Sequence, residues 1–271
     1  MGRQDVDVSS DRRIGPAAVV RGIALEIAWA SAHVSTYPLG LLHERRRAAD
    51  SRRLTLSGLD PVRRGLLAGD VEVAGTPIVM VHGIADNRTT FTVMRRALRR
   101  RGFERVVSVD YGWLATDLRT LAARLGAEVG RVCNRTGYER VNVVAHSMGG
   151  LVARYYVQRL GGHAKVRTLV TLGTPHAGTR WAAGLPHPLL RQLRPGSRFL
   201  AELAAPSPGC RTRFVVVWSD LDQVVVPHSN ARLRHVDLDV REIAVHGVGH
   251  MSLPVDSRVV HEVCTALFGV T

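Results

Sequence analysis

Three residues of the sequence have side chains that together could perform nucleophilic catalysis: Ser147, Asp222 and His250. A serine hydroxyl is a weak nucleophile at neutral pH, so it needs a histidine to accept its proton and a carboxylate to hold that histidine in the correct tautomer. The three residues occur in this order along the chain, and each follows an apolar run that predicts a buried strand. Since the carboxyl ends of parallel strands meet at one edge of a sheet, we expect the three side chains to converge there.

Ser147 lies within residues 141–150, which read Val-Asn-Val-Val-Ala-His-Ser-Met-Gly-Gly. This order predicts a strand, a sharp turn and the start of a helix, with Ser147 at the apex of the turn. The small residues on either side allow the strand and helix backbones to approach closely. Any Ala/Gly-Ser-Gly turn between a strand and a helix has the same appearance, so the assignment of Ser147 as the nucleophile depends on the other loops.

The acid of such a site has two candidates in the loop at residues 219–227. Asp220 directly follows the predicted strand, whereas Asp222 lies deeper in the loop and just before Val-Val-Val-Pro. We favour Asp222 as the acid. Asp256 is a further candidate, but it follows the histidine loop at the start of the last predicted helix, and we interpret it as a helix cap.

The base also has two candidates, in the loop His-Gly-Val-Gly-His-Met at residues 246–251. His250 can turn toward Ser147 because glycines make this loop flexible. His246 lies closer to the end of the strand, and we interpret it as structural. Two histidines four residues apart can bind metal on a helix, but the intervening glycines argue against a helix and there is no His-Glu-x-x-His motif. We therefore expect no metal site.

Acyl transfer also requires N–H donors for the oxyanion of the tetrahedral intermediate. The backbone N–H of Met148 is one donor by its position after the nucleophile. We assign the second to Ile84, because Gly83 allows the backbone after the first strong strand to turn toward Ser147. We interpret His82 as a support for that loop, and we expect the side chain of His146 to point away from the active face.

From Pro77 onward, strand and helix patterns alternate. The predicted strands are residues 78–81, 105–109, 140–144, 166–172, 213–218 and 240–245. The predicted helices are residues 89–101, 117–132, 150–160 and 256–268. Apolar runs separated by helices indicate a parallel sheet that is covered on both faces, so we predict an α/β fold.

One connection is long, and it contains no predicted strand: residues 174–212. We predict that this segment forms a small cap at the carboxyl side of the sheet, where ligands bind in open α/β folds. His176, at its start, could line the cleft. The candidate acyl-chain contacts of the cap are Trp181, Leu185, Leu189, Leu193 and Phe199. The simpler explanation for any one of them is ordinary core packing between the cap and the sheet.

Residues 1–70 form a predicted N-terminal helical extension to the main domain at residues 71–271. Its apolar helix, residues 17–34, carries Arg21, Glu26 and His33, which is atypical of a cleavable signal sequence. Each charge near the centre of a membrane span would cost about 2.5–3.5 kcal/mol. We therefore expect the helix to pack on the domain or to lie on a membrane surface, as a peripheral contact, rather than to span the membrane.

The chain carries a formal charge of +14, from 37 basic and 23 acidic residues, and Lys165 is its single lysine. The arginines are scattered and only 5% of the residues are aromatic, so we do not expect nucleic-acid binding. Cys133, Cys210 and Cys264 form no Cys-x-x-Cys motif, which favours neither a disulfide framework nor a zinc site. The cysteines do not decide the cellular location of the protein. We favour a cytoplasmic or membrane-associated location and do not exclude secretion.

From about residue 76 to its end, the sequence resembles the α/β-hydrolase family, and in particular the compact bacterial lipases related to secreted Bacillus enzymes. The matching motifs are Val-His-Gly-Ile at 81–84, Ala-His-Ser-Met-Gly-Gly at 145–150, Leu-Gly-Thr-Pro at 172–175, Ser-x-x-Asp at 219–222 and His-Gly-Val-Gly-His at 246–250. The resemblance implies Ser147, Asp222 and His250 as a catalytic triad, with Ile84 and Met148 as oxyanion donors. The N-terminal extension and the longer cap depart from the smallest family members.

These observations predict a lipase or carboxylesterase that cleaves esters with an apolar acyl group through an acyl-enzyme. No cofactor is needed, and the expected partner is a lipid or ester substrate. Two alternatives remain. An acyltransferase would use the same triad with an alcohol or amine as acceptor, and fold and triad alone do not distinguish it from a hydrolase. A non-catalytic protein would bind an apolar ligand in the same cleft.

Overall fold

The structure, a computed structural model, describes residues 75–83, 88–103, 105–109, 116–184 and 187–268. The predicted N-terminal extension, with its helix at residues 17–34, lies outside the described residues, as do Ile84 and Leu185. Within the described ranges the chain alternates between strands and helices, as the apolar pattern predicts.

A six-stranded sheet forms the centre of the molecule, with its strands in the order β2-β1-β3-β4-β5-β6 and every neighbouring pair parallel. The strands are β1 (Ile78–Val81), β2 (Val106–Val109), β3 (Val141–His146), β4 (Val166–Leu172), β5 (Arg213–Ser219) and β6 (Asp239–Val245). The chain runs from β1 outward to β2 and then returns to place β3 on the other side of β1. The strand order therefore reverses between β1 and β3, and such a switch point is where open α/β sheets bind their ligands.

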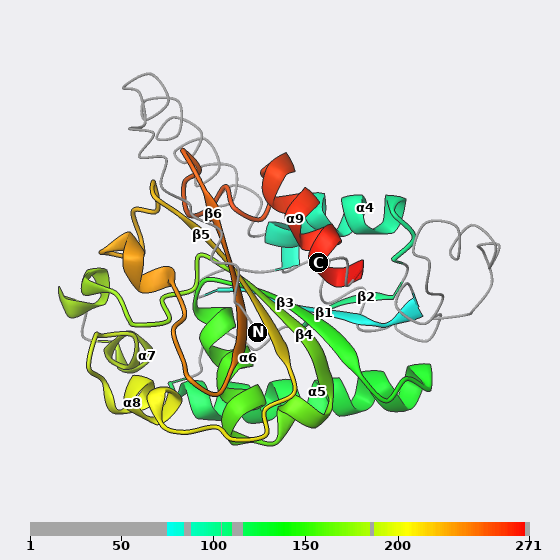
Figure 1. The fold of residues 1–271 in the computed structure, drawn as a ribbon, viewed down its shortest axis with the longest axis horizontal. Helices are drawn as coiled ribbons and strands as arrows, with labels where there is room; N and C mark the ends of the chain where they lie inside the picture. Colours follow the sequence, from blue (N-terminus) through cyan, green and yellow to red (C-terminus); the bar gives the residue numbers. More distant parts are fainter. Residues whose placement is uncertain (1–74, 84–87, 104, 110–115, 185–186, 269–271) are drawn as a thin grey trace, which may run out of the picture.

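Helices cover both faces of the sheet (Figure 1). Helices α5 (Leu118–Thr136) and α6 (Met148–Arg159) lie on one face, and α4 (Thr92–Arg100) and α9 (Ser257–Phe268) lie on the other. A parallel sheet covered in this way buries both sides of its central strands β1, β3, β4 and β5, which explains the continuous apolar runs in the sequence.

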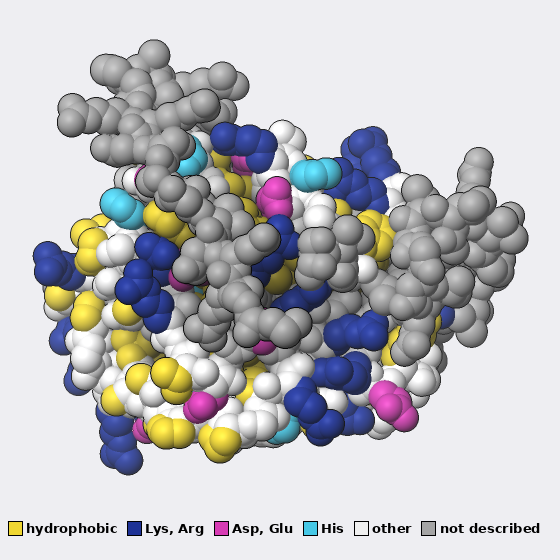
Figure 2. All heavy atoms as spheres, viewed as in Figure 1, with side chains coloured by type: hydrophobic (Ala, Val, Ile, Leu, Met, Phe, Trp, Pro, Cys, Tyr) yellow, Lys and Arg dark blue, Asp and Glu magenta, His cyan; other side chains and the backbone are white. Residues whose placement is uncertain are grey.

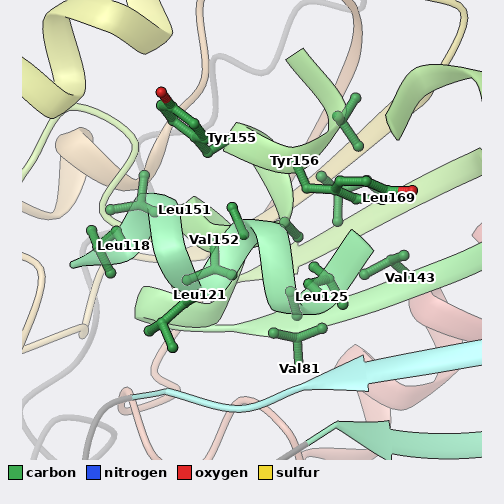
Figure 3. Close-up of a cluster of buried hydrophobic side chains, with 14 of the residues drawn as sticks. Val81, Leu118, Leu121, Leu125, Val143, Leu151, Val152, Tyr155, Tyr156 and Leu169 are labelled. Carbon is green, nitrogen blue, oxygen red and sulfur yellow. The ribbon is translucent and has the colours of Figure 1, made fainter. Parts of the chain in front are cut away.

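Two hydrophobic clusters result, one on each face. Strand β1 contributes Val79 and Val81 to the cluster under α5 and α6, and Ile78 and Met80 to the cluster under α4 and α9. Figure 3 shows side chains of the first cluster, where leucines of α5 and α6 pack on valines of the strands. This alternation follows from the two-residue period of a strand.

The structure confirms each predicted strand and helix that lies within the described residues. The boundaries move by a few residues: α6 begins at Met148, two residues before the predicted start, and α5 continues to Thr136. The short helix η1 (Arg88–Phe91) precedes α4. Asp256 acts as the predicted cap, because its Oδ1 accepts hydrogen bonds from the N–H groups of Arg258 and Val259.

The segment at residues 174–212 contains η3 (Arg180–Gly184), α7 (Pro188–Gln192) and α8 (Arg198–Ala204). Figure 1 shows α7 and α8 near α6. The Gln192 side chain accepts a hydrogen bond from the N–H of Leu118 at the start of α5, and Glu202 pairs with Arg119 at 2.8 Å. The segment is therefore fastened to the helical layer on this face of the sheet.

Three of the five candidate acyl-chain contacts belong to the core. Leu189, Leu193 and Phe199 are buried in the cluster with α6, and the ring of Phe199 stacks on Tyr155 at a centroid distance of 5.1 Å. The simpler explanation is correct for these three residues, because their side chains attach the segment to the domain. Trp181 differs, since about half of it is exposed.

The first turn of α6 provides a test of the packing at the switch point. A methyl group at Gly149 would lie 2.6 Å from the carbonyl oxygen of Val81 and closer still to that of His82. We expect Gly149→Ala to lower the free energy of unfolding by about 1–3 kcal/mol, because backbone atoms must move. A methyl group at Gly130 of α5 would meet no atom within 4 Å. Gly130→Ala should therefore raise the free energy of unfolding by about 0.5–1 kcal/mol. Thermal or urea unfolding of both variants measures the two changes in stability. Equal changes in Gly149→Ala and Gly130→Ala would contradict the prediction.

Candidate active site

Ser147 occupies a strained turn between β3 and α6. Its backbone has φ 56° and ψ −132°, and among the described residues it is the one non-glycine with a positive φ. A residue other than glycine keeps such a conformation when its surroundings fix it, and functional sites concentrate such strain. The N–H of Ser147 donates to the Leu172 carbonyl at 2.9 Å, and its own carbonyl accepts from the Thr174 hydroxyl at 2.9 Å.

Glycines allow three chain segments to meet at this turn. A Cβ atom at Gly83, just after β1, would lie 3.0 Å from the Cβ of Ser147. A Cβ atom at Gly150 would overlap the side chain of Thr174. The two glycines after the nucleophile, Gly149 and Gly150, therefore let α6 start directly against the loops that follow β1 and β4.

Asp222 and His250 form a buried pair at the carboxyl ends of β5 and β6. The Nδ1 of His250 lies 2.8 Å from Oδ2 of Asp222, and the two side chains are 3% and 0% exposed. The other carboxylate oxygen accepts hydrogen bonds from the N–H groups of Val224 (2.9 Å) and Val225 (2.8 Å). The imidazole is thus oriented through its Nδ1 by a carboxylate that is itself held by the backbone.

Several effects act on the pKa of the Asp222 carboxyl. Burial by itself would raise the pKa. The charge of His250, its hydrogen bond and the two backbone donors outweigh burial, so the pKa lies below its ordinary value. Asp222 is therefore ionised at neutral pH and can accept a hydrogen bond from the Nδ1–H of His250.

Gly173, which follows β4, packs against this pair. A Cβ atom at this position would lie 3.0 Å from Oδ2 of Asp222 and 3.1 Å from Nδ1 of His250, and its φ is 54°. Glycine is therefore required here for two reasons, space and backbone conformation. In the sequence, Gly173 stands out only as part of the Leu-Gly-Thr-Pro motif, and nothing there places it next to the acid and the base.

His146 also belongs to the site. We expected its side chain to point away from the active face, but its Nε2 lies 3.1 Å from the carbonyl oxygen of His250, and the two rings are 4.8 Å apart. His146 is buried and immediately precedes Ser147. It therefore connects the strand that carries Ser147 to the loop that carries His250, a contact between residues 104 positions apart that the sequence pattern did not indicate.

The alternative acid, Asp220, and the alternative base, His246, pair with each other. The Nδ1 of His246 lies within hydrogen-bonding distance of the Asp220 carboxylate, which also accepts from the N–H of Gly247. The His246 side chain is 56% exposed. This second pair fixes the start of the histidine loop at the surface, which supports the interpretation of His246 as structural.

Of the two predicted oxyanion donors, Met148 and Ile84, the structure describes Met148. Met148 is the first residue of α6, and the helix leaves its N–H without an intrahelical acceptor. Ile84 lies outside the described residues, which stop at Gly83 in this loop. His82 is buried, with its Nδ1 3.0 Å from the carbonyl oxygen of Gly83, in keeping with a role in supporting the loop.

The residues that the structure describes contain no group of three or more histidine, cysteine, aspartate or glutamate side chains placed to hold a metal ion. The three cysteines are all free thiols. None of the helices in the described ranges is both long enough and apolar enough to cross a bilayer. On the face shown in Figure 2, the basic side chains are spread out rather than gathered in one patch.

Comparison with known proteins places this site in context. Residues 77–203 match the family model of palmitoyl protein thioesterases. A triacylglycerol lipase from Pseudarthrobacter phenanthrenivorans is 30% identical over 113 residues, which is 39% of this chain and 35% of the lipase. A triacylglycerol lipase from Burkholderia plantarii is also 30% identical, over 39% of this chain and 31% of its own length. The chain thus spans about a third of the length of these relatives.

Solved structures show the fold more completely. The mature lipase BlEst2 of Bacillus licheniformis has a TM-score of 0.59 at 18% identity, with 72% of this chain and 92% of the lipase covered. Aspergillus fumigatus lipase B has a TM-score of 0.61 at 16% identity, with 71% and 52% covered. The chain therefore has the α/β-hydrolase fold. It is similar in sequence to the two triacylglycerol lipases and similar in structure to the two microbial lipases.

Proposed function

We propose that the protein is a serine hydrolase that cleaves carboxylic esters with an apolar acyl group, with Ser147 as nucleophile, His250 as base and Asp222 as the acid that orients it. The observation that carries the proposal is the buried hydrogen bond between His250 and Asp222, together with a serine in a strained turn whose preceding residue, His146, contacts the carbonyl of His250. The sequence similarity to triacylglycerol lipases over 39% of the chain supports an ester as the substrate.

The proposed mechanism assigns each group one task. Ser147 Oγ attacks the carbonyl carbon of the ester while Nε2 of His250 takes its proton, and Asp222 stabilises the imidazolium that forms. The N–H of Met148, together with that of Ile84, donates to the oxyanion. His250 then protonates the leaving alcohol, and a water molecule, deprotonated by His250, attacks the acyl-enzyme to release the carboxylic acid and free Ser147.

The match to the palmitoyl protein thioesterase model favours a second candidate substrate, a long-chain acyl thioester. The same groups would act on it, with a thiol as the leaving group. Oxygen esters and thioesters of the same acyl chain distinguish the two candidates. Ester hydrolysis much faster than thioester hydrolysis would support the first, and the reverse would support the second.

Replacement of the nucleophile tests the proposed function. We expect Ser147→Ala to lower kcat for a p-nitrophenyl ester by at least about 10⁴-fold, because no other group can form the acyl-enzyme. The variant should unfold at the same temperature as the parent protein. Ser257→Ala, at an exposed serine that begins α9, is a matched control that should keep full activity. Equal activity of Ser147→Ala and the parent protein would refute the proposal.

A pair of aspartate variants tests which carboxylate serves the base. We expect Asp222→Asn to lower kcat by about 10⁴-fold, because the amide favours the wrong tautomer of His250. Asp220→Asn should keep nearly full activity and lose at most about 1 kcal/mol of stability, since its partner His246 is largely exposed. Steady-state kinetics of the two variants make the comparison, and a greater loss in Asp220→Asn would reverse the assignment.

A further inference from the structure

Arg154 is a buried cation that the proposed mechanism does not use. It lies on α6, seven residues after Ser147, or roughly 10 Å along the helix axis. Its side chain donates to Oε1 of Gln158 (2.7 Å), to the carbonyl of His176 (3.2 Å) and to the carbonyl of Leu203 (3.0 Å). Arg154 is only 3% exposed, so it is enclosed between α6 and the segment that carries α8.

The three acceptors of Arg154 are all neutral, and no described carboxylate forms an ion pair with it. A buried charge without an opposite charge is costly. Burial, with a smaller contribution from the charge of Arg159, lowers the pKa of Arg154 to about 9. The guanidinium is therefore still protonated at pH 7, and two of its five N–H groups have no hydrogen-bond acceptor among the described residues.

Arg154 lines a cavity of about 750 Å³, a size typical of sites for small molecules. The cavity lies between α8 and the segment that includes η4 (His228–Ala231) and continues to Val236. Its apolar lining residues are Ala177, Leu200, Ala201, Ala204, Leu233 and Val236. Its further basic lining residues are Arg232, which pairs with Glu242, and Arg234 and His235.

His176 lines the same cavity and is buried. Its Nε2 lies 3.0 Å from the Thr171 hydroxyl, whereas its Nδ1 has no hydrogen-bond partner among the described residues. Burial, with the charge of Arg154 in addition, lowers the pKa of His176 well below its usual value, so the ring is neutral at pH 7. If Thr171 donates to Nε2, the ring proton is on Nδ1, which is then an unused donor on the residue whose carbonyl binds Arg154.

We propose that this cavity binds a carboxylate that carries an apolar chain, such as a medium-chain fatty-acid anion. Arg154 and His176 would receive the carboxylate, and Leu200, Ala204 and Leu233 would contact the chain. A carboxylate provides both the missing negative charge and the acceptor for the unused donors. The lining includes none of Ser147, Asp222 and His250, so this site is separate from the candidate active site.

Octanoate binding to the full-length Ser147→Ala variant tests the proposal without any dependence on hydrolysis. We expect calorimetry to show one site for octanoate. Octanol and acetate should each bind at least about tenfold more weakly, because octanol lacks the carboxylate and acetate lacks the apolar chain. Arg154→Gln, and His176→Gln, which keeps a polar group toward Thr171, should each weaken octanoate binding about tenfold. Arg234→Ser should weaken it less, and Arg124→Ser, at an exposed arginine of α5 outside the cavity, should not change it.

Arg154 also holds the carbonyls of His176 and Leu203, so its replacement could unfold the protein. Hydrogen exchange of the Ser147→Ala variant gives a measurement that does not depend on Arg154 variants. Octanoate should slow exchange in α8 and in residues 232–236, and octanol should not. Equal binding of octanol and octanoate, or octanoate binding that Arg154→Gln and His176→Gln both leave unchanged, would overturn the proposal. Protection confined to the loops of Asp222 and His250 would overturn it as well.

Discussion

The buried hydrogen bond between His250 and Asp222 is the interaction on which the rest of the candidate site depends. A carboxylate with no exposed surface is tolerated because one oxygen accepts two backbone N–H groups and the other faces the imidazole. The pair also requires a glycine at position 173, since a side chain there would contact both partners. Three loops, after β4, β5 and β6, are therefore fixed relative to one another by one pair of side chains.

The strained turn at Ser147 is supported in a similar way from several directions. The Leu172 carbonyl, the Thr174 hydroxyl and the close approach of Gly83 all fix the turn from neighbouring strand ends. His146, one residue earlier, contacts the carbonyl of the base. Since these supports come from the ends of four parallel strands, the twist and order of the sheet set the relative positions of nucleophile and base. Helix α6 extends this arrangement to Arg154, which lines the cavity proposed to bind a carboxylate.

The sequence was sufficient to predict the sheet, its helices and the loops that carry Ser147, Asp222 and His250, because a strand buried on both faces has a continuous apolar run and its end is marked by polar residues. It was not sufficient for contacts made between distant segments. The contact of His146 with the His250 loop, the place of Gly173 beside the acid and the burial of Arg154 depend on how strands and helices pack. Leu189, Leu193 and Phe199 are apolar, and an apolar side chain fits a substrate contact and a core contact equally well. Only the packing in the structure shows that these three side chains contact the core.

Labelling with a fluorophosphonate tests the central claim, that the turn, the base and the acid make Ser147 a nucleophile. The intact protein would be treated with the probe, digested and analysed by mass spectrometry to find the modified residue, with His250→Ala treated in parallel. We predict one adduct, on Ser147, which forms much more slowly in His250→Ala. A folded protein that remains unlabelled at Ser147, or that is labelled there equally fast without His250, would contradict it.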